Sequence, residues 1–131
     1  MPDSKAVSTE RAPAAIGPYS QGILAGGFLF ISGQIPLDPA TGEMVGGGVP
    51  EQAERVLENL KEILQAAGAG MDAVVRTTVY LTDLAEFSRM NQVYARYFTG
   101  SPPARSTVQV GALPRGAQVE IDAIAKIGDR G

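Results

Sequence analysis

The chain has 131 residues and a formal net charge of −3, and it contains no histidine, cysteine or tryptophan. These absences exclude disulfides, structural zinc sites and catalytic systems that depend on an imidazole or a thiolate. The acidic balance, with a pI near 4.9, argues against a nucleic-acid-binding surface. Hydrophobic residues at 44% and charged residues at 19% are typical of one globular domain, expected to span residues 1–131.

The first residues lack the basic region and apolar run of a secretory signal. No stretch approaches the ~20 apolar residues of a membrane-spanning helix. We therefore expect a cytoplasmic protein that does not associate with membranes. The acidic residues do not cluster with calcium-loop spacing, and the segment Asp38–Glu43 indicates a turn. No metal site and no cofactor are expected.

The N-terminal part of the chain predicts three short strands. Lys5–Ser8 is the first candidate, and Ala12–Ser20 then forms a loop, because two prolines and a glycine exclude regular structure. Gly22–Ala25 and Phe28–Gly33 are strand-like runs separated by Gly26 and Gly27. Glycine tolerates positive φ at both central positions of a two-residue turn, so the two runs predict a β-hairpin.

Helical and strand patterns alternate in the rest of the chain. Apolar residues at i, i+3, i+4 and i+7 over Pro50–Ala67 predict an amphipathic helix that stops at Gly68. The β-branched stretch Ala73–Thr82 predicts a strand, and Leu84–Phe98 predicts a second helix capped by Asp83. The last two predicted strands are Ala104–Val110 and Gln118–Ile127.

This order of elements favours an α+β fold, a mixed β-sheet with two helices on one face. The other face also carries apolar residues. Phe28–Ile31 is apolar on both sides of its strand, and Ile124 shares a face with Glu120. Exposure of such an apolar surface to water is unfavourable, so we expect another copy of the chain to bury it. A symmetric homo-oligomer follows, and sites between its subunits become possible.

Arg105 and Glu120 are charged residues on the last two predicted strands, where a packed core would not require them. A planar guanidinium can donate two parallel hydrogen bonds to a carboxylate. A carboxylate within hydrogen-bond reach can orient or deprotonate a water molecule. The pattern alone leaves open a weak surface ion pair for Arg105 and a cross-strand partner role for Glu120.

Five motifs resemble those of one family, the reactive intermediate/imine deaminase family, also called RidA or YjgF. They occur in the family's order and with matching separations, and they extend over nearly the whole chain. The motifs are APAAIGPYSQ at 12–21, ISGQIP at 31–36, RTTVYLTD at 76–83, NQVY at 91–94, and PAR at 103–105 with VEI at 119–121.

The resemblance implies a chorismate-mutase-like homotrimer with three clefts between subunits. It implies hydrolysis of 2-iminobutanoate and 2-iminopropanoate to 2-oxo acids and ammonia, without a cofactor. Two other functions stay open: a non-catalytic trimer that binds small carboxylates, and the ribonuclease or translation-inhibiting activity attributed to relatives. The absence of histidine and the acidic charge count against the ribonuclease.

Matching positions imply roles for individual residues. Arg105 is expected to bind the substrate carboxylate, and Glu120 to orient or deprotonate the attacking water. These two are the expected catalytic residues. Tyr19 is expected in the pocket, although it could instead anchor its loop on the core. The backbone amides around Ser32 and Gly33 are expected to donate hydrogen bonds to the reacting group. The glycine could equally mark a bulge or a strand end.

Two further positions carry weaker expectations. The resemblance also implies that Thr107 contacts the substrate through its backbone and small side chain. Many relatives have cysteine at this position, so thiol-dependent behaviour is not expected of this chain. Asn91 lies on the apolar stripe of the second predicted helix, one turn after Phe87. A buried amide needs hydrogen-bond partners, which favours a structural bridge to loop backbone over ligand contact.

Overall fold

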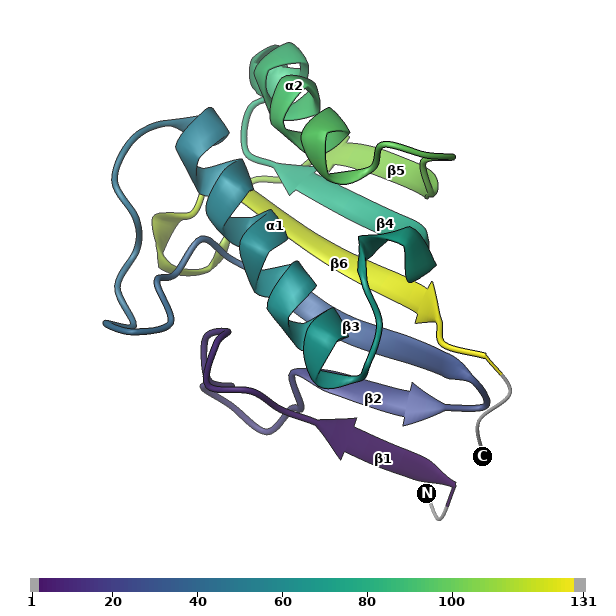
Figure 1. Cartoon of the computed structure of the whole chain (residues 1–131). Helices are drawn as coiled ribbons and strands as arrows, with labels where there is room; N and C mark the ends of the chain where they lie inside the picture. Colours follow the sequence, from purple (N-terminus) through teal and green to yellow (C-terminus); the bar gives the residue numbers. More distant parts are fainter. Residues whose placement is uncertain (1–2, 129–131) are drawn as a thin grey trace.

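In the computed structural model, which describes residues 3–128, two helices lie on one face of a six-stranded mixed β-sheet (Figure 1). The predicted α+β architecture is therefore confirmed. The terminal residues of the expected domain, 1–2 and 129–131, lie outside the described range. The strands are β1 Ser4–Val7, β2 Gly22–Ala25, β3 Phe28–Gln34, β4 Val74–Leu81, β5 Ala104–Gln109 and β6 Val119–Lys126. The helices are α1 Val49–Ala66 and α2 Phe87–Tyr97, with 3-10 turns η1 Met71–Ala73, η2 Leu84–Glu86 and η3 Pro114–Gly116.

The strand order is β1-β2-β3-β6-β4-β5, so the last strand of the chain lies inside the sheet. All neighbouring pairs are antiparallel except β4 and β5, which are parallel. A parallel pair needs a crossover connection, and α2 supplies it. Strand β5 forms one edge of the sheet, and β4 separates it from β6. Arg105 on β5 and Glu120 on β6 are therefore not on neighbouring strands.

The predicted hairpin is confirmed. Gly26 and Gly27 have φ values of 59° and 83°, and Ala25 pairs with Phe28 across the turn. Side chains with a Cβ rarely adopt this left-handed conformation, which explains why two glycines occur together here.

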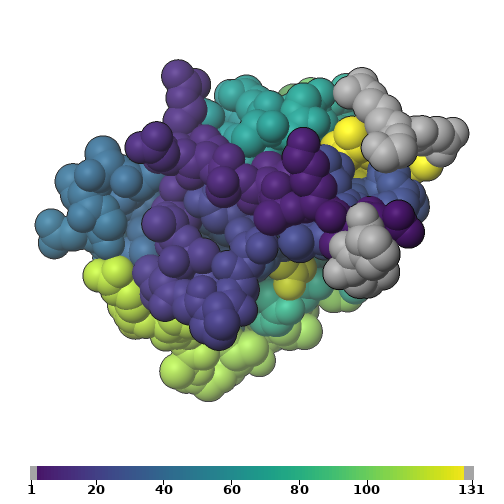
Figure 2. Space-filling view, turned by 90° about the horizontal axis from the view of Figure 1, so that it is seen from below, coloured from purple at the N-terminus to yellow at the C-terminus, as the bar shows by residue number. Residues whose placement is uncertain are grey.

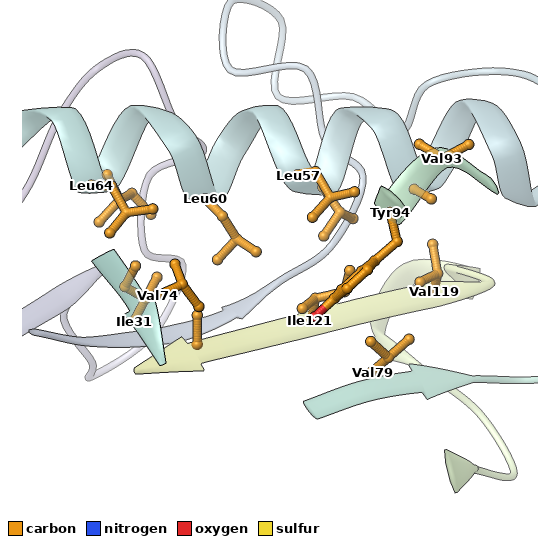
Figure 3. Close-up of a cluster of buried hydrophobic side chains, with 14 of the residues drawn as sticks. Ile31, Leu57, Leu60, Leu64, Val74, Val79, Val93, Tyr94, Val119 and Ile121 are labelled. Carbon is orange, nitrogen blue, oxygen red and sulfur yellow. The ribbon is translucent and has the colours of Figure 1, made fainter. Parts of the chain in front are cut away.

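The hydrophobic core lies between α1 and the central strands. Leu57, Leu60 and Leu64 point from α1 toward the sheet (Figure 3), and each is at most 1% exposed. Val119 and Ile121 meet them from β6. Burial of these side chains at about 1.5–3 kcal/mol each holds the helix layer on the sheet.

Residues of β6 alternate between the two faces of the sheet. Val119 and Ile121 are buried beneath the helices, whereas Glu120 and Asp122 lie on the opposite face. Phe30 of β3 pairs with Ile124 and is 45% exposed on that same face. Both α1 and α2 lie on the other side of the sheet, so neither covers this surface (Figure 1). We call it the open face.

The second predicted helix, Leu84–Phe98, differs from the structure at its start. Leu84–Glu86 forms a 3-10 turn, and the α-helix begins at Phe87. The expected cap is confirmed, because the Asp83 carboxylate accepts a hydrogen bond from the Ala85 amide at 2.9 Å. The Leu84 amide also donates to the Gln109 side chain of β5 at 2.8 Å, which ties this turn to the sheet edge.

None of the helices described in residues 3–128 is long and apolar enough to cross a membrane.

Candidate active site

Arg105 lies on the helix-covered side of the sheet edge. It pairs in register with Thr77 of β4, which is fully buried beneath α2. The guanidinium carbon Cζ is 4.7 Å from the centroid of the Tyr94 ring and 5.5 Å from that of the Phe87 ring. Both aromatic residues belong to α2. The arginine is therefore held by cation–π contacts rather than by an opposite charge.

No carboxylate within residues 3–128 forms an ion pair with Arg105; the ion pairs in this range involve Arg11 and Arg89. The alternative of a surface ion pair within the protomer is therefore not what the structure shows. A guanidinium stays charged at any working pH. Its charge is available to an anion that comes from outside the protomer.

Glu120 lies on the open face, with its carboxylate directly over Gly33 of β3. A Cβ placed on Gly33 would collide with Oε2 of Glu120, so a side chain at residue 33 would require this carboxylate to move. The register of β3 and β6 shifts at this position, between Ile31 and Gln34. Gly33 thus marks a bulge, as one of the two sequence interpretations expected, and it also permits the close approach of the carboxylate.

The pKa of Glu120 is raised above its ordinary value, chiefly because burial penalises the charged form. The negative charge of Asp122, two residues along the same face of β6, raises that pKa further. Asp122 accepts a hydrogen bond from the Tyr80 hydroxyl at 3.0 Å, and Tyr80 pairs in register with Glu120. No hydrogen bond or ion pair engages the Glu120 carboxylate within the described chain.

Arg105 and Glu120 do not meet within one protomer. Arg105 faces α2, Glu120 lies on the open face, and β4 separates their strands. One protomer therefore presents the two expected catalytic groups on opposite sides of its sheet.

Tyr19 and Ser32 are brought together by the loop that precedes β2. The Ser32 hydroxyl donates to the Ser20 carbonyl at 2.6 Å, and the Ser32 amide donates to the Gln21 carbonyl at 2.9 Å. Of the backbone amides around Ser32 and Gly33 that were expected to donate to the reacting group, the Ser32 amide is therefore already used inside the protomer. Tyr19 is half-exposed and contacts a groove of about 710 Å³ lined mainly by the N-terminal segment, purple in Figure 2.

Gln21 is a residue whose importance the sequence interpretation missed. Its buried side chain accepts from the Thr9 amide at 2.7 Å and donates to the carbonyls of Thr9, Ala12 and Pro13. These bonds fix the loop that carries Tyr19. Its place in a proline-bounded motif directly before a strand was the signal available in the sequence.

Thr107 and Asn91 lie on the same side of the sheet as Arg105. Thr107 is two residues beyond Arg105 on β5 and pairs with the buried Val79. Asn91 is partly buried on α2, and its Oδ1 has no hydrogen-bond partner within residues 3–128. That oxygen thus lacks the expected bridge to loop backbone.

Sequence interpretation also missed the groups that surround the two charges. Phe87 and Tyr94 fit the helical spacing of Leu84–Phe98, and that spacing does not distinguish them as contacts of Arg105. Asp122 follows Glu120 by two residues, so strand alternation could have placed it on the same face. No group of three or more acidic residues in the described chain could hold a metal ion.

Comparisons with known proteins identify the family of this chain. The family model described as Endoribonuclease L-PSP matches residues 9–127. The chain belongs to the RidA/YjgF family. A relative named 2-iminobutanoate/2-iminopropanoate deaminase from Mus musculus is 54% identical over 92% of this chain and 90% of its own. Protein DfrA of Myxococcus xanthus is 64% identical, covering 92% of this chain and 94% of its own.

Solved structures of the same family share the fold. The crystal structure of E. coli TdcF with bound serine matches with a TM-score of 0.89 and 46% identity, covering 93% of this chain and 98% of that one. The RidA/YjgF resemblance of the motifs is thereby confirmed for nearly the whole chain.

The carboxyl of Asp122 controls part of the pKa shift of Glu120, and this can be tested by substitution. Asp122→Asn removes the nearby negative charge, so we expect the pKa of Glu120 to fall while remaining above its ordinary value because of burial. Side-chain carbon NMR titration of wild type and variant measures this change. Asp38→Asn, on a distant turn, is the control. An unchanged or higher Glu120 pKa in Asp122→Asn would contradict this interpretation.

Proposed function

We propose that this protein hydrolyses reactive 2-imino acids to 2-oxo acids and ammonia, with 2-iminobutanoate and 2-iminopropanoate as its substrates. The observation that carries the proposal is the Arg105 guanidinium, which has no carboxylate partner among residues 3–128 of its own protomer. A free guanidinium suits the carboxylate that every 2-imino acid carries. Mammalian relatives bearing the deaminase name add support.

Glu120 is the proposed general base. The substrate reacts as the protonated imine: the carboxylate removes a proton from water as the water oxygen bonds to the imine carbon, giving a neutral tetrahedral carbinolamine. The carboxyl then returns that proton to nitrogen. As the carbon–nitrogen bond breaks and ammonia leaves, the carboxylate takes the proton of the carbinolamine hydroxyl, which becomes the carbonyl of the 2-oxo acid, and this proton passes to the ammonia. A raised pKa suits a group that both accepts and donates a proton near neutral pH.

The proposed site lies between two copies of the chain in a homotrimer. Arg105 and Glu120 lie on opposite sides of one sheet, so one substrate cannot contact both groups of the same protomer. The open face, with the exposed Phe30, offers apolar surface for a second copy to cover. Closed symmetry then brings Arg105 of one copy toward Glu120 of another.

Serine in the TdcF structure is an amino acid with a free carboxylate, the same chemical class as the proposed substrates. The ribonuclease in the family model's description receives less support here. Without histidine, this chain cannot use an imidazole for acid–base chemistry on RNA, and its net charge of −3 disfavours phosphate binding.

Imine hydrolysis by purified protein tests the proposal directly. An amino-acid oxidase generates 2-iminobutanoate from 2-aminobutanoate, and formation of 2-oxobutanoate is followed. We expect wild type to accelerate this step and Glu120→Gln to lower kcat/KM by about 10²- to 10⁴-fold, since a general base contributes that much. Arg105→Ala should lower kcat/KM through weaker binding of the carboxylate.

Two results would contradict the proposal. Equal rates for wild type and Arg105→Ala would rule out the proposed clamp. Binding of 2-oxobutanoate without any acceleration of imine hydrolysis would favour the non-catalytic carboxylate-binding trimer instead. RNA is incubated in parallel, and we expect neither cleavage nor salt-sensitive binding.

Gly33→Ala tests whether the position of the Glu120 carboxylate matters. The backbone of residue 33 does not need a positive φ, but the added Cβ would occupy the space of Oε2 of Glu120. The flexible carboxylate must move, so we expect kcat to fall by about tenfold or more while the fold is retained. Gly46→Ala is the matched control, because a Cβ there meets nothing within 4 Å. Wild-type kcat in Gly33→Ala would show that the carboxylate's present position is unimportant.

A further inference from the structure

We propose that Phe87 and Tyr94 are positioning residues for Arg105, holding its guanidinium between two aromatic rings with its N–H edge presented to a carboxylate. This inference rests on the proposed function, in which Arg105 binds the carboxylate of the substrate. It adds a specific claim about how an arginine without an ion-pair partner is kept in one orientation.

The spacing of the two rings fits one guanidinium. Phe87 and Tyr94 are seven residues apart on α2, two helical turns, which corresponds to a rise of about 10.5 Å. Cζ of Arg105 lies 5.5 Å from one ring centroid and 4.7 Å from the other. Both distances are within the range of a cation–π contact, so one guanidinium contacts both rings.

The Tyr94 ring is held in one position by contacts with its neighbours. Tyr94 is 5% exposed and extends from α2 toward the sheet (Figure 3). Its hydroxyl shares a 2.7 Å hydrogen bond with Thr77, the residue that pairs with Arg105 on the neighbouring strand. The Phe98 ring packs against it with centroids 4.6 Å apart. The Tyr94 ring is therefore held by β4 through Thr77 and by the C-terminal end of α2 through Phe98.

Phe87, at the first turn of α2, is the more exposed of the two aromatic residues, with 38% of its surface accessible. Aromatic rings attract a guanidinium through its flat faces, whereas its N–H groups point outward in its plane. Arg105 also lowers the pKa of the Tyr94 hydroxyl, partly through a side-chain hydrogen bond, although burial raises that pKa overall. A guanidinium has five N–H donors, so a contact with this hydroxyl leaves enough of them for two parallel hydrogen bonds to a carboxylate. Without the ring contacts, the long arginine side chain would sample many rotamers in solvent.

Substitution of Phe87 separates this role from general stability. Phe87→Leu keeps an apolar side chain but removes the π face. We expect KM for 2-iminobutanoate and Kd for the unreactive 2-oxobutanoate to rise about threefold to tenfold, with kcat changing less than twofold. Phe87→Trp restores an aromatic face and should return both constants to near the wild-type values.

Phe28→Leu is the matched control. Phe28 also forms a cation–π contact, with Nζ of Lys126 at 5.1 Å from its ring, but it lies on β3 away from Arg105. The same substitution there should leave KM and Kd unchanged. Unfolding midpoints of all variants, measured in parallel, identify any change that comes from a loss of folded protein.

A double-mutant cycle shows whether Phe87 acts through Arg105. In the Arg105→Ala background, Phe87→Leu should change kcat/KM by less than twofold, because the group it positions is absent. Three results would overturn the inference: an unchanged Kd in Phe87→Leu, no rescue by Phe87→Trp, or an equal effect of Phe87→Leu with and without Arg105. Failure of the proposed function is distinct: wild type would then not accelerate imine hydrolysis, whereas Kd for 2-oxobutanoate in the Arg105 and Phe87 variants would still report on the positioning of Arg105.

Discussion

Alternation of side chains across a sheet that carries helices on one face determines where each charged group of this protein lies. Odd-numbered residues of β6 pack beneath α1, so Glu120 and Asp122 must face the other way. Arg105 pairs with the buried Thr77 and therefore faces α2. The two groups proposed for catalysis are thus separated by the sheet itself. A substrate can contact both only where a second copy of the chain contributes one of them.

Arg105 and Glu120 have different surroundings, which suit them to different chemical roles. Arg105 contacts two aromatic rings, and its charge has no counter-ion within residues 3–128. Glu120 lies over a glycine, near a second carboxylate, in an environment that raises its pKa. An unpaired charge in a partly buried place is unfavourable unless an anion or a proton compensates it. In the proposed function, a small carboxylate substrate compensates the charge of Arg105, and proton transfer to and from water uses the raised pKa of Glu120.

Much of the fold could be predicted from the sequence because its signals are local. Apolar spacing located α1, and paired glycines located the β2–β3 hairpin. The insertion of β6 between β3 and β4 depends on pairing between distant segments, which no local pattern encodes. For that reason the sequence identified Arg105 and Glu120 as residues but not the opposite faces on which they lie. Phe87 and Tyr94 were missed as contacts of Arg105 because an apolar stripe has the same appearance whether it packs on a core or on a cation.

Subunit complementation tests the central claim of a shared site most directly. Arg105→Ala and Glu120→Gln chains, each inactive alone, are mixed under conditions that allow subunits to exchange, and imine hydrolysis is measured. If each site takes Arg105 from one copy and Glu120 from a neighbour, random assembly of equal amounts leaves about a quarter of the sites with both groups intact, and activity returns accordingly. If mixed oligomers form but their activity stays at the level of the two parent variants, the site does not lie between subunits and the account is wrong.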